Sequence, residues 1–210
     1  MESIEKIVAK QLLDIKAVKL NPENPFTWAS GWKSPIYCDN RKVLSYPAAR
    51  KVVYEAFVEI IKKNFKDVEV IAGVATGAIA YGMMVAEVLG LPFVYVRPKP
   101  KDHGTGAQVE GDLPDKARVV VVEDLISTGG SSLAAVDALQ KAGANVLGMV
   151  AIFSYNFIKS IRAFENANIE LHTLSHYEAL LEKAVEENYI KSEDLAVLKE
   201  WRINPEIWGK

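Results

Sequence analysis

The sequence has little cysteine, no long apolar run and no excess of charge of either sign, and each shortage excludes a class of protein. Its 210 residues include one cysteine, Cys38, so no disulfide can form within the chain and a reducing compartment is favoured. No apolar run approaches the roughly 20 residues that are needed to span a bilayer. The 25 basic and 27 acidic residues give a formal charge of −2, which favours neither nucleic acid nor a membrane surface as a partner.

The first residues of the chain, Met-Glu-Ser-Ile-Glu-Lys, lack the basic start and the apolar core of a secretory signal. We therefore expect a cytoplasmic protein. The length fits one domain with a proper core, or one domain with a small subdomain.

Apolar periodicity predicts strands and helices that alternate over most of the chain. We expect helices over residues 4–15 and from Pro47 to about residue 65. Further along, strands are predicted at 68–74, 93–96, 118–122, 146–153 and 170–174, and helices at 78–89, 130–142, 158–166, 176–188 and 192–201. This alternation predicts an α/β fold with a mostly parallel central sheet flanked by helices.

Residues 17–45 differ from the rest and predict a small N-terminal cap subdomain. Pro22, Pro25, Gly31 and Pro35 interrupt this stretch, with short strands expected at 26–28 and 36–38. We accordingly divide the chain into an N-terminal helix and cap (residues 1–45) and a core domain (residues 46–210). The core domain contains a long polar loop at residues 97–117, which we expect to be flexible.

The segment at residues 118–132 carries the strongest chemical signal. An apolar strand is followed by the acid pair Glu123 and Asp124, by a turn rich in hydroxyls and glycine at 127–131, and by a helix. Such a turn directs backbone N–H groups at a phosphate, and the helix N-terminus adds partial positive charge. Carboxylates beside a phosphate repel it unless they face sugar hydroxyls or Mg²⁺. The ordered segment therefore predicts a site for a phosphorylated sugar. An acid pair before a Gly-Gly turn is also common in loops that only connect a strand to a helix.

The polar loop gives a second signal. Arg97, Lys99, Lys101 and His103 fall within seven residues, and glycines follow at 104, 106 and 111. Such a loop is often only a solvated surface segment. Opposite a phosphate site, however, the pattern favours a cationic flap that closes over a polyanionic substrate.

Three separated segments resemble a known family. The string Glu123-Asp124-Leu125-Ile126-Ser127-Thr128-Gly129-Gly130-Ser131 resembles the phosphoribosyl pyrophosphate (PRPP) signature of type I phosphoribosyltransferases. The cap segment FTWASGWKSPIY at 26–37 and the loop segment KDHG at 101–104 resemble the orotate phosphoribosyltransferases within that family. The resemblance implies the type I fold, transfer of phosphoribose from PRPP to orotate, Mg²⁺ as cofactor, and a homodimer that shares loop 97–111 between subunits. The alternatives are a phosphoribosyltransferase for another nucleobase, or a regulator that senses PRPP.

The resemblance also implies roles for individual residues. Catalysis would fall to Lys101, Asp102, His103, Glu123 and Asp124, and Mg²⁺ would be held through the substrate with Glu123 and Asp124. Ser127, Tyr37 and Lys33 would bind orotate. The residues implied to bind PRPP are Arg97, Lys101, His103, Glu123, Asp124, Leu125, Ile126, Ser127, Thr128, Gly129, Gly130 and Ser131.

The chain departs from the family pattern where some members hold the base. Pro98 follows the loop arginine in place of a lysine, Ala29 stands for a cap lysine, and residues 153–156 read Phe-Ser-Tyr-Asn where an arginine occurs elsewhere. How the orotate carboxylate is held therefore stays open, with Lys33, Arg41, Ser127 and backbone N–H groups as candidates.

Two further patterns carry less weight. The turn at 74–77, after an apolar strand, lies near the pyrophosphate in the family but could equally be a plain tight turn. His172 and His176 are separated by an expected strand-to-helix junction, so we expect no zinc site there.

Overall fold

A computed structural model of the chain describes residues 2–100 and 108–209. Its centre is a six-stranded sheet with the strand order β10-β9-β8-β5-β6-β7. Every pairing is parallel except that of β7 with β6. The strands are β5 (Val70–Val74), β6 (Phe93–Val96), β7 (Val109–Glu110), β8 (Arg118–Ile126), β9 (Asn145–Ser154) and β10 (Leu171–His176). The predicted α/β fold with a mostly parallel sheet is confirmed.

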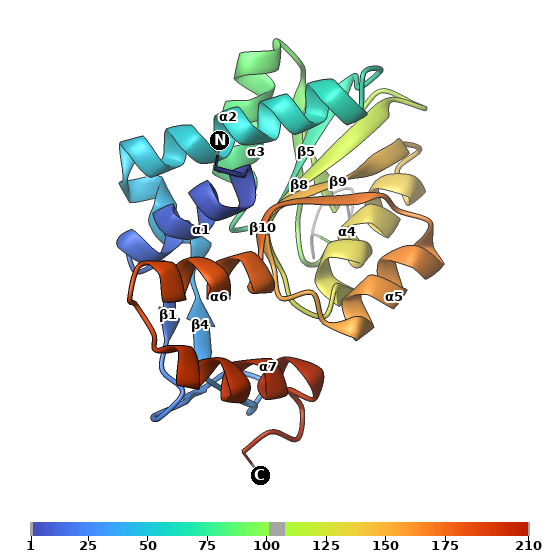
Figure 1. Cartoon of the computed structure of the whole chain (residues 1–210). Coiled ribbons are helices and arrows are strands. Elements are labelled where there is room, and N and C mark those ends of the chain that lie inside the picture. Colours follow the sequence, from blue (N-terminus) through green and yellow to red (C-terminus); the bar gives the residue numbers. More distant parts are fainter. Residues whose placement is uncertain (1, 101–107, 210) are drawn as a thin grey trace.

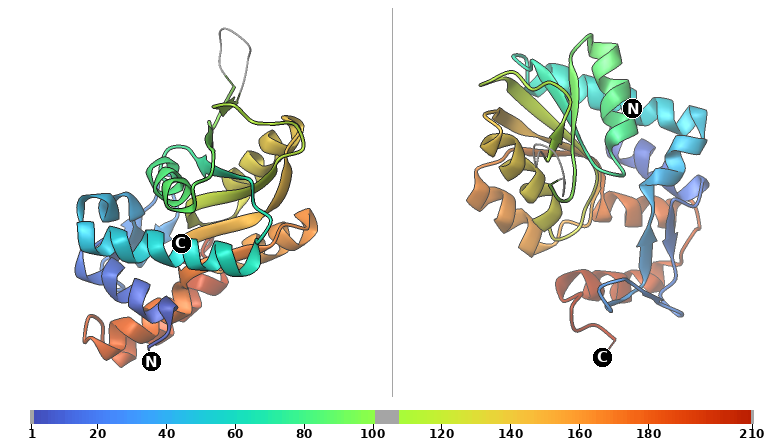
Figure 2. Two further views of the ribbon diagram at one scale, coloured as in Figure 1. Left: turned by 90° about the horizontal axis from the view of Figure 1, so that it is seen from above. Right: turned by 180° about the vertical axis from the view of Figure 1, so that it is seen from behind.

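Helices cover both faces of the sheet (Figures 1 and 2). α2 (Pro47–Asn64) and α3 (Ile79–Leu89) lie on one face, and α4 (Gly130–Lys141) and α5 (Ile158–Ala167) lie on the other. Burial on two faces explains why β5 and the first half of β8 are runs of apolar residues rather than alternating ones, since neither face of such a strand meets water.

The order of the strands creates one opening at the edge of the sheet. From β5 the chain moves outward through β6 and β7, and it then returns to β8 and moves the other way through β9 and β10. β5 and β8 are adjacent, with Gly73 opposite Val122, so the switch point lies between them. Ligands of open α/β sheets bind at the carboxyl ends of the strands that flank such a point. The fold therefore places residues after Val74 and around Ile126 at one site.

The cap consists of two small antiparallel pairs and a short 3₁₀ helix. β1 (Val18–Leu20) pairs with β4 (Ile36–Cys38), and β2 (Phe26–Thr27) pairs with β3 (Lys33–Ser34). The 3₁₀ helix η1 (Asn40–Ser45) follows β4 and leads back to the core. At the other end of the chain, the 3₁₀ helix η2 (Ser192–Asp194) precedes α7 (Leu195–Ile203), which lies beside the cap strands (Figures 1 and 2).

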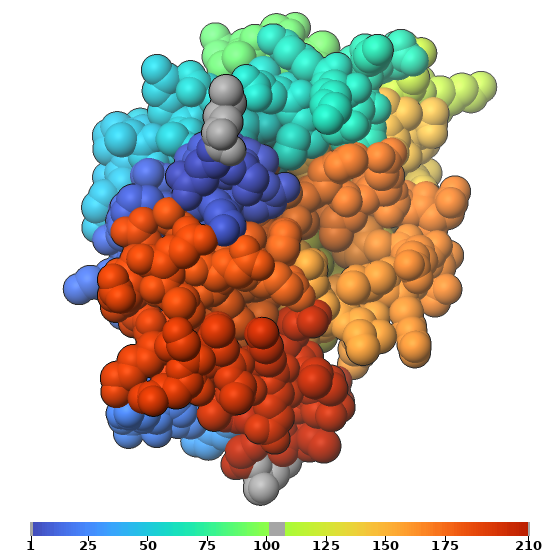
Figure 3. Space-filling view, in the orientation of Figure 1, coloured from blue at the N-terminus to red at the C-terminus, as the bar shows by residue number. Residues whose placement is uncertain are grey.

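Trp201 of α7 joins the cap to the core. Its side chain is fully buried, and its indole Nε1 donates a hydrogen bond to the Lys33 carbonyl oxygen at 3.2 Å. Ring-centroid distances of 5.3 to 5.7 Å place it in one aromatic cluster with Trp28, Tyr155, Phe157 and Tyr177. Residues from the cap, the end of β9 and the last helices thus share one small core, and the space-filling view shows this C-terminal region against the cap (Figure 3).

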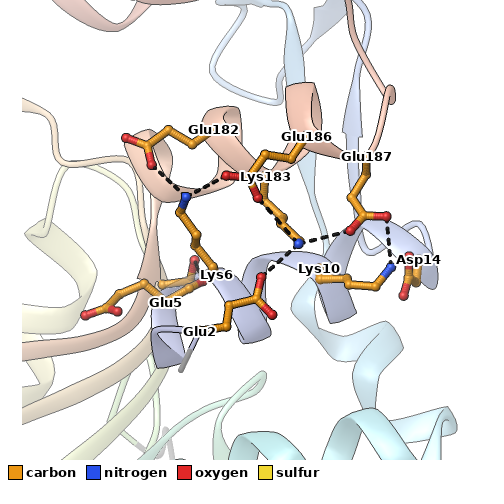
Figure 4. Close-up of polar contacts among 10 residues, drawn as sticks. Glu2, Glu5, Lys6, Lys10, Asp14, Glu182, Lys183, Glu186 and Glu187 are labelled. Carbon is orange, nitrogen blue, oxygen red and sulfur yellow. Dashed lines mark hydrogen bonds and ion pairs between the residues drawn. The ribbon is translucent and has the colours of Figure 1, made fainter.

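Ion pairs tie the first helix to a late one. α1 (Ile4–Asp14) packs against β10 and α6 (Tyr177–Glu186), and charged side chains line their contact (Figure 4). Lys183 Nζ lies 2.8 Å from Glu2 and 3.0 Å from Glu187, while Lys6 Nζ lies 2.6 Å from Glu186. These carboxylates raise the pKa of both lysines, so the network holds its charge at neutral pH.

Most of the predicted helices and strands are confirmed within a few residues, and the differences arise from strand pairing. β8 does not end at Val122 but continues through the acid pair to Ile126, because β9 is long enough to pair with it as far as Ser154. Residues 109–110, expected to be loop, form β7 against β6. The sequence analysis also missed β1 and β3, which are too short to show a period. In the described part of the chain, we find no helix with the length and apolar character to cross a membrane.

We predict that Trp201→Ala lowers the free energy of unfolding by about 3–5 kcal/mol, because it removes a large buried ring from the cluster. Trp201→Phe keeps much of the packing but loses the bond to Lys33, and should cost about 1–2 kcal/mol. Urea unfolding monitored by circular dichroism measures both values. Val197→Ala, on an exposed position of the same helix, is the control and should change stability by less than about 0.5 kcal/mol. Equal stability of Trp201→Ala and Val197→Ala would contradict the role of this cluster.

Candidate active site

A cavity of about 500 Å³ opens at the carboxyl ends of β5 and β8, at the switch point of the sheet. Three segments meet there: the end of β4 with the start of η1, the turn after β5, and the end of β8 with the turn before α4. The lining residues are Cys38, Asp39, Asn40, Arg41, Val74, Ala75, Thr76, Gly77, Glu123, Asp124, Leu125, Ser127, Thr128, Gly129 and Ser131.

The turn between β8 and α4 has the geometry of a phosphate site. Gly129 has a φ of +84°, which only glycine adopts readily, and an added Cβ would lie 3.1 Å from the Phe164 ring. α4 begins at the next residue, so its first N–H groups have no carbonyl partner within the helix. In residues 2–100 and 108–209, the N–H groups of residues 128–131 find no acceptor. Thr128, Gly129 and Ser131 line the cavity, where an anion would satisfy such groups.

Glu123 is the buried member of the acid pair. Its side chain is nearly inaccessible, with Oε1 accepting a hydrogen bond from the Asp124 N–H at 2.9 Å and Oε2 accepting one from Ser132 Oγ at 2.9 Å. Burial, and then the adjacent charge of Asp124, raise the pKa of Glu123 well above its usual value. Glu123 therefore carries a proton through much of the neutral range in the free protein.

Asp124 is the accessible member of the pair, and its neighbours fix its position. An added Cβ on Gly77, in the turn after β5, would overlap the Asp124 carboxylate, so only glycine allows this close approach. Asn40 Nδ2 donates to the Asp124 carbonyl oxygen, and the Asn40 carbonyl accepts from the Tyr81 hydroxyl at 2.8 Å. Burial raises the pKa of Asp124, while Arg41 opposes that rise.

Arg41 and Asp39 form an ion pair on the η1 side of the cavity. Arg41 Nε lies 2.7 Å from Asp39 Oδ1, and a second guanidinium nitrogen lies 3.1 Å from Oδ2. Hydrogen bonding to Arg41 lowers the pKa of Asp39, which therefore stays ionised. The sequence analysis named neither Asp39 nor Asn40. Their signal was the placement of two polar residues directly after the strand at 36–38, which resembles the polar end of β8.

The residues expected to bind ligands separate into three groups. Glu123, Asp124, Leu125, Ser127, Thr128, Gly129 and Ser131 meet at the cavity, whereas Gly130 is not among its lining residues and Ile126 is fully buried. Arg97 follows β6, beside the turn after β5, and its guanidinium lies 3.7 Å from the Glu110 carboxylate; its backbone N–H donates to the Gln108 carbonyl at 2.9 Å. Lys101, Asp102 and His103 lie outside the described residues.

The two cap residues expected to bind orotate contact other residues of the cap. Lys33 Nζ donates to Thr27 Oγ1 at 2.8 Å across the β2–β3 pair. The Tyr37 ring lies 5.8 Å from that of Phe26 and is about two-fifths exposed. Neither side chain is among the residues that line the cavity.

The carboxylate oxygens of Glu123 and Asp124 suit a metal ion that enters bound to a substrate. Carboxylate oxygens are ligands that Mg²⁺ prefers. Over the described ranges, His, Cys, Asp and Glu side chains form no cluster of three or more that could hold a metal ion. Because both oxygens of Glu123 are already engaged, Asp124 is the more available ligand. A bound Mg²⁺ would therefore take most of its ligands from substrate and water.

We predict that Glu123→Gln removes part of the pH dependence of stability. The carboxyl of Glu123 has a higher pKa when folded than when unfolded, so its favourable contribution is present at low pH and is lost as pH rises from about 4 through the raised value. Between pH 5 and pH 9, burial that raises the Glu123 pKa to about 8 should make wild type lose about 4 kcal/mol more unfolding free energy than the variant. Urea unfolding at several pH values measures this, with the exposed Glu165→Gln as control. Parallel pH profiles for Glu123→Gln and wild type would show that Glu123 is ionised in the folded state.

Comparison with known proteins agrees with this geometry. The sequence matches the model of the phosphoribosyl transferase domain over residues 40–165, which span η1 to α5 and contain most of the cavity. An orotate phosphoribosyltransferase from Porphyromonas gingivalis is 54% identical over 209 residues, covering 100% of both chains. One from Listeria innocua is 56% identical over 208 residues, covering 99% of this chain and 100% of the relative.

Solved structures show the same fold. A crystal structure of orotate phosphoribosyltransferase from Aeropyrum pernix superposes with a TM-score of 0.76 at 29% identity, covering 88% of this chain and 99% of that one. The structure of Leishmania donovani UMP synthase gives a TM-score of 0.78 at 26% identity, over 94% of this chain and 42% of the larger protein. With relatives this similar over the full length, the chain belongs to the orotate phosphoribosyltransferase family.

Proposed function

We propose that the protein transfers the 5-phosphoribosyl group of PRPP to orotate, giving orotidine 5′-monophosphate and pyrophosphate. The observation that carries this proposal is the phosphate turn at 127–131 beside the Asp124 carboxylate, at the switch point of the sheet. The relatives named orotate phosphoribosyltransferase at 54–56% identity support the choice of base. In the cell, the reaction would serve the synthesis of pyrimidine nucleotides in the cytoplasm.

The geometry supports a division of PRPP among three subsites. The N–H groups at 128–131 and the hydroxyls of the same turn would bind the 5′-phosphate. Asp124, whose carboxylate lies against Gly77, would accept hydrogen bonds from ribose hydroxyls. Glu123 Oε1 accepts from the Asp124 N–H and so fixes the backbone there. The turn at Thr76 and Gly77 lies beside Asp124 and would receive the pyrophosphate through their backbone N–H groups, because the Ala75 N–H already donates to the Val96 carbonyl at 2.9 Å.

Chemistry at the anomeric carbon follows from this placement. The bond from that carbon to the pyrophosphate oxygen breaks, and a bond to the orotate ring nitrogen forms. The anomeric carbon becomes cationic between these events, as in glycoside chemistry, and the Asp124 charge beside the ribose favours that cation. Because the orotate nitrogen can attack as its anion, we assign no general base to the protein.

The leaving pyrophosphate gains negative charge, which calls for cations. Three basic side chains would stabilise that charge: Arg97, which precedes the loop, and Lys101 and His103 within it. Asp102 stands between the last two in the sequence. Mg²⁺, brought in with PRPP and contacted by Asp124, would neutralise pyrophosphate oxygens when bound. We also propose a homodimer in which loop 97–111 of one subunit reaches the site of the other, since two-fold dimers are the commonest oligomer.

The first test is consumption of orotate, measured as loss of its ultraviolet absorbance on mixing with PRPP, Mg²⁺ and protein. We expect consumption that requires both PRPP and Mg²⁺, with no product from uracil, adenine or hypoxanthine at equal concentration. Product from one of those bases, with orotate unused, would assign the protein to another base. Binding of PRPP without turnover of any base would favour a PRPP-sensing regulator.

We predict that Lys101→Ala slows turnover much more than it weakens binding of PRPP. If the lysine meets charge that develops on the leaving group, its removal should raise the barrier by about 2–4 kcal/mol, while the Kd for PRPP changes less than about tenfold. Steady-state kinetics and titration calorimetry measure the two effects. Lys141→Ala, which removes an exposed lysine of α4 paired with Asp137, is the control. A turnover number like that of wild type would remove Lys101 from the catalytic set.

A further inference from the structure

The proposed function leaves one part of the substrate without a partner. Orotate differs from uracil by a carboxylate, and a buried or half-buried carboxylate needs a cation or several donors. The cavity already contains Asp39, Glu123 and Asp124, so an anionic base entering it meets carboxylates on two sides. A cation on the base side would meet this need and offset the charge of the neighbouring acids.

We propose that Arg41 binds the orotate carboxylate and is the residue by which the site distinguishes a carboxylated pyrimidine from an uncarboxylated one. This inference rests on the proposed function. Among the described residues that line the cavity, Arg41 is the one lysine or arginine. Arg97 stands apart, at the end of β6, where it faces Glu110.

The ion pair with Asp39 leaves Arg41 able to take a second carboxylate. Asp39 engages Nε and one terminal nitrogen, at 2.7 and 3.1 Å. A guanidinium has five N–H donors in a fixed plane, so three remain after this side-on contact. These donors lie on the far edge of the group, and more than half of the side chain is exposed. A second carboxylate can therefore bind without displacing Asp39.

Backbone contacts hold the pair at the correct border of the site. Asp39 N–H donates to the Ala17 carbonyl at 2.8 Å, and Asp39 Oδ1 accepts from the Arg41 N–H at 3.2 Å, which fixes the start of η1. The residue between them, Asn40, donates to the Asp124 carbonyl oxygen. Arg41 is thus one residue from a direct link to the proposed ribose site, and it lines the same cavity as Asp124. A base joined to that ribose would have its substituents within this neighbourhood.

The other candidates are engaged elsewhere. Lys33 Nζ bonds to Thr27 within the cap and does not line the cavity. Arg202 bonds to the Asn156 carbonyl at 2.9 Å and to Glu178 at 3.1 Å, and it does not line the cavity. Ala29 and residues 153–156 contain no cation. Asp39 is a positioning residue in this arrangement, since it orients Arg41 but would not touch the base.

The test compares two ligands that differ only by the carboxylate: orotidine 5′-monophosphate and uridine 5′-monophosphate. Titration calorimetry gives the Kd of each for wild type, Arg41→Gln and Arg41→Lys. We expect Arg41→Gln to weaken orotidine 5′-monophosphate about 10- to 100-fold and uridine 5′-monophosphate less than about threefold. Arg41→Lys should fall between, because an ammonium keeps the charge but not the planar fork. The Kd for PRPP should stay within about threefold of wild type in both variants.

Two variants serve as comparisons. Lys19→Gln removes an exposed lysine of β1 that lies outside the cavity, and it should leave the ratio of the two affinities unchanged. Lys33→Gln tests the rival cation. The proposal would be overturned if Lys33→Gln abolished the difference in affinity between the two nucleotides while Arg41→Gln kept it. It would also be overturned if Arg41→Gln weakened the binding of both nucleotides equally. If wild type fails to consume orotate, the proposed function itself fails; if wild type is active and Arg41→Gln keeps the ratio, only the Arg41 assignment fails.

Discussion

The structure depends on two adjacent carboxylates held inside a parallel strand. Glu123 and Asp124 belong to β8, which pairs with β9 along this stretch, and Glu123 is buried while Asp124 is half-buried. The protein accommodates them differently: Ser132 and the Asp124 N–H satisfy Glu123, while the absence of a side chain at Gly77 makes room for Asp124. Burial would protonate such groups, so the site gains from any ligand that brings cations or hydroxyl donors. In this account, the cost of keeping Asp124 half-buried is recovered when Mg²⁺ and ribose bind.

The remaining elements place other segments around that pair. Asn40 links the end of β4 to Asp124, and the Gly129 turn directs α4 at the same cavity. The cap is in turn anchored from the opposite end of the chain, because Trp201 bonds to Lys33 and packs against Trp28. Both the cap strands and α7 lie outside the matched phosphoribosyl transferase domain, at residues 40–165. The common domain thus contains the proposed sugar and phosphate sites, and the two flanking regions of the chain form one additional unit beside them.

Sequence patterns predicted the sheet, its helices and the turn before α4 because each follows from a local rule: apolar runs indicate buried strands, a 3.6-residue period indicates helices, and a run of glycines and hydroxyls indicates a turn. They placed the end of β8 too early, since residues 123–126 continue as a strand only because β9 pairs with them. The unequal roles of Glu123 and Asp124 could not be predicted, because they depend on Ser132 and Gly77 in space. Arg41 could be named only as one candidate among several. Its pairing with Asp39 and its place in the cavity lining, from which Lys33 is absent, set it apart.

The central claim is that Asp124, rather than the turn alone, makes this cavity a site for phosphorylated ribose. Titration of PRPP in the presence of Mg²⁺ into wild type and Asp124→Asn tests it most directly, since the substitution keeps the shape beside Gly77 and removes the charge. The account predicts that PRPP binds the variant at least about tenfold more weakly, while inorganic phosphate, which needs only the turn, binds both proteins alike. Equal affinity of the two proteins for PRPP would contradict it.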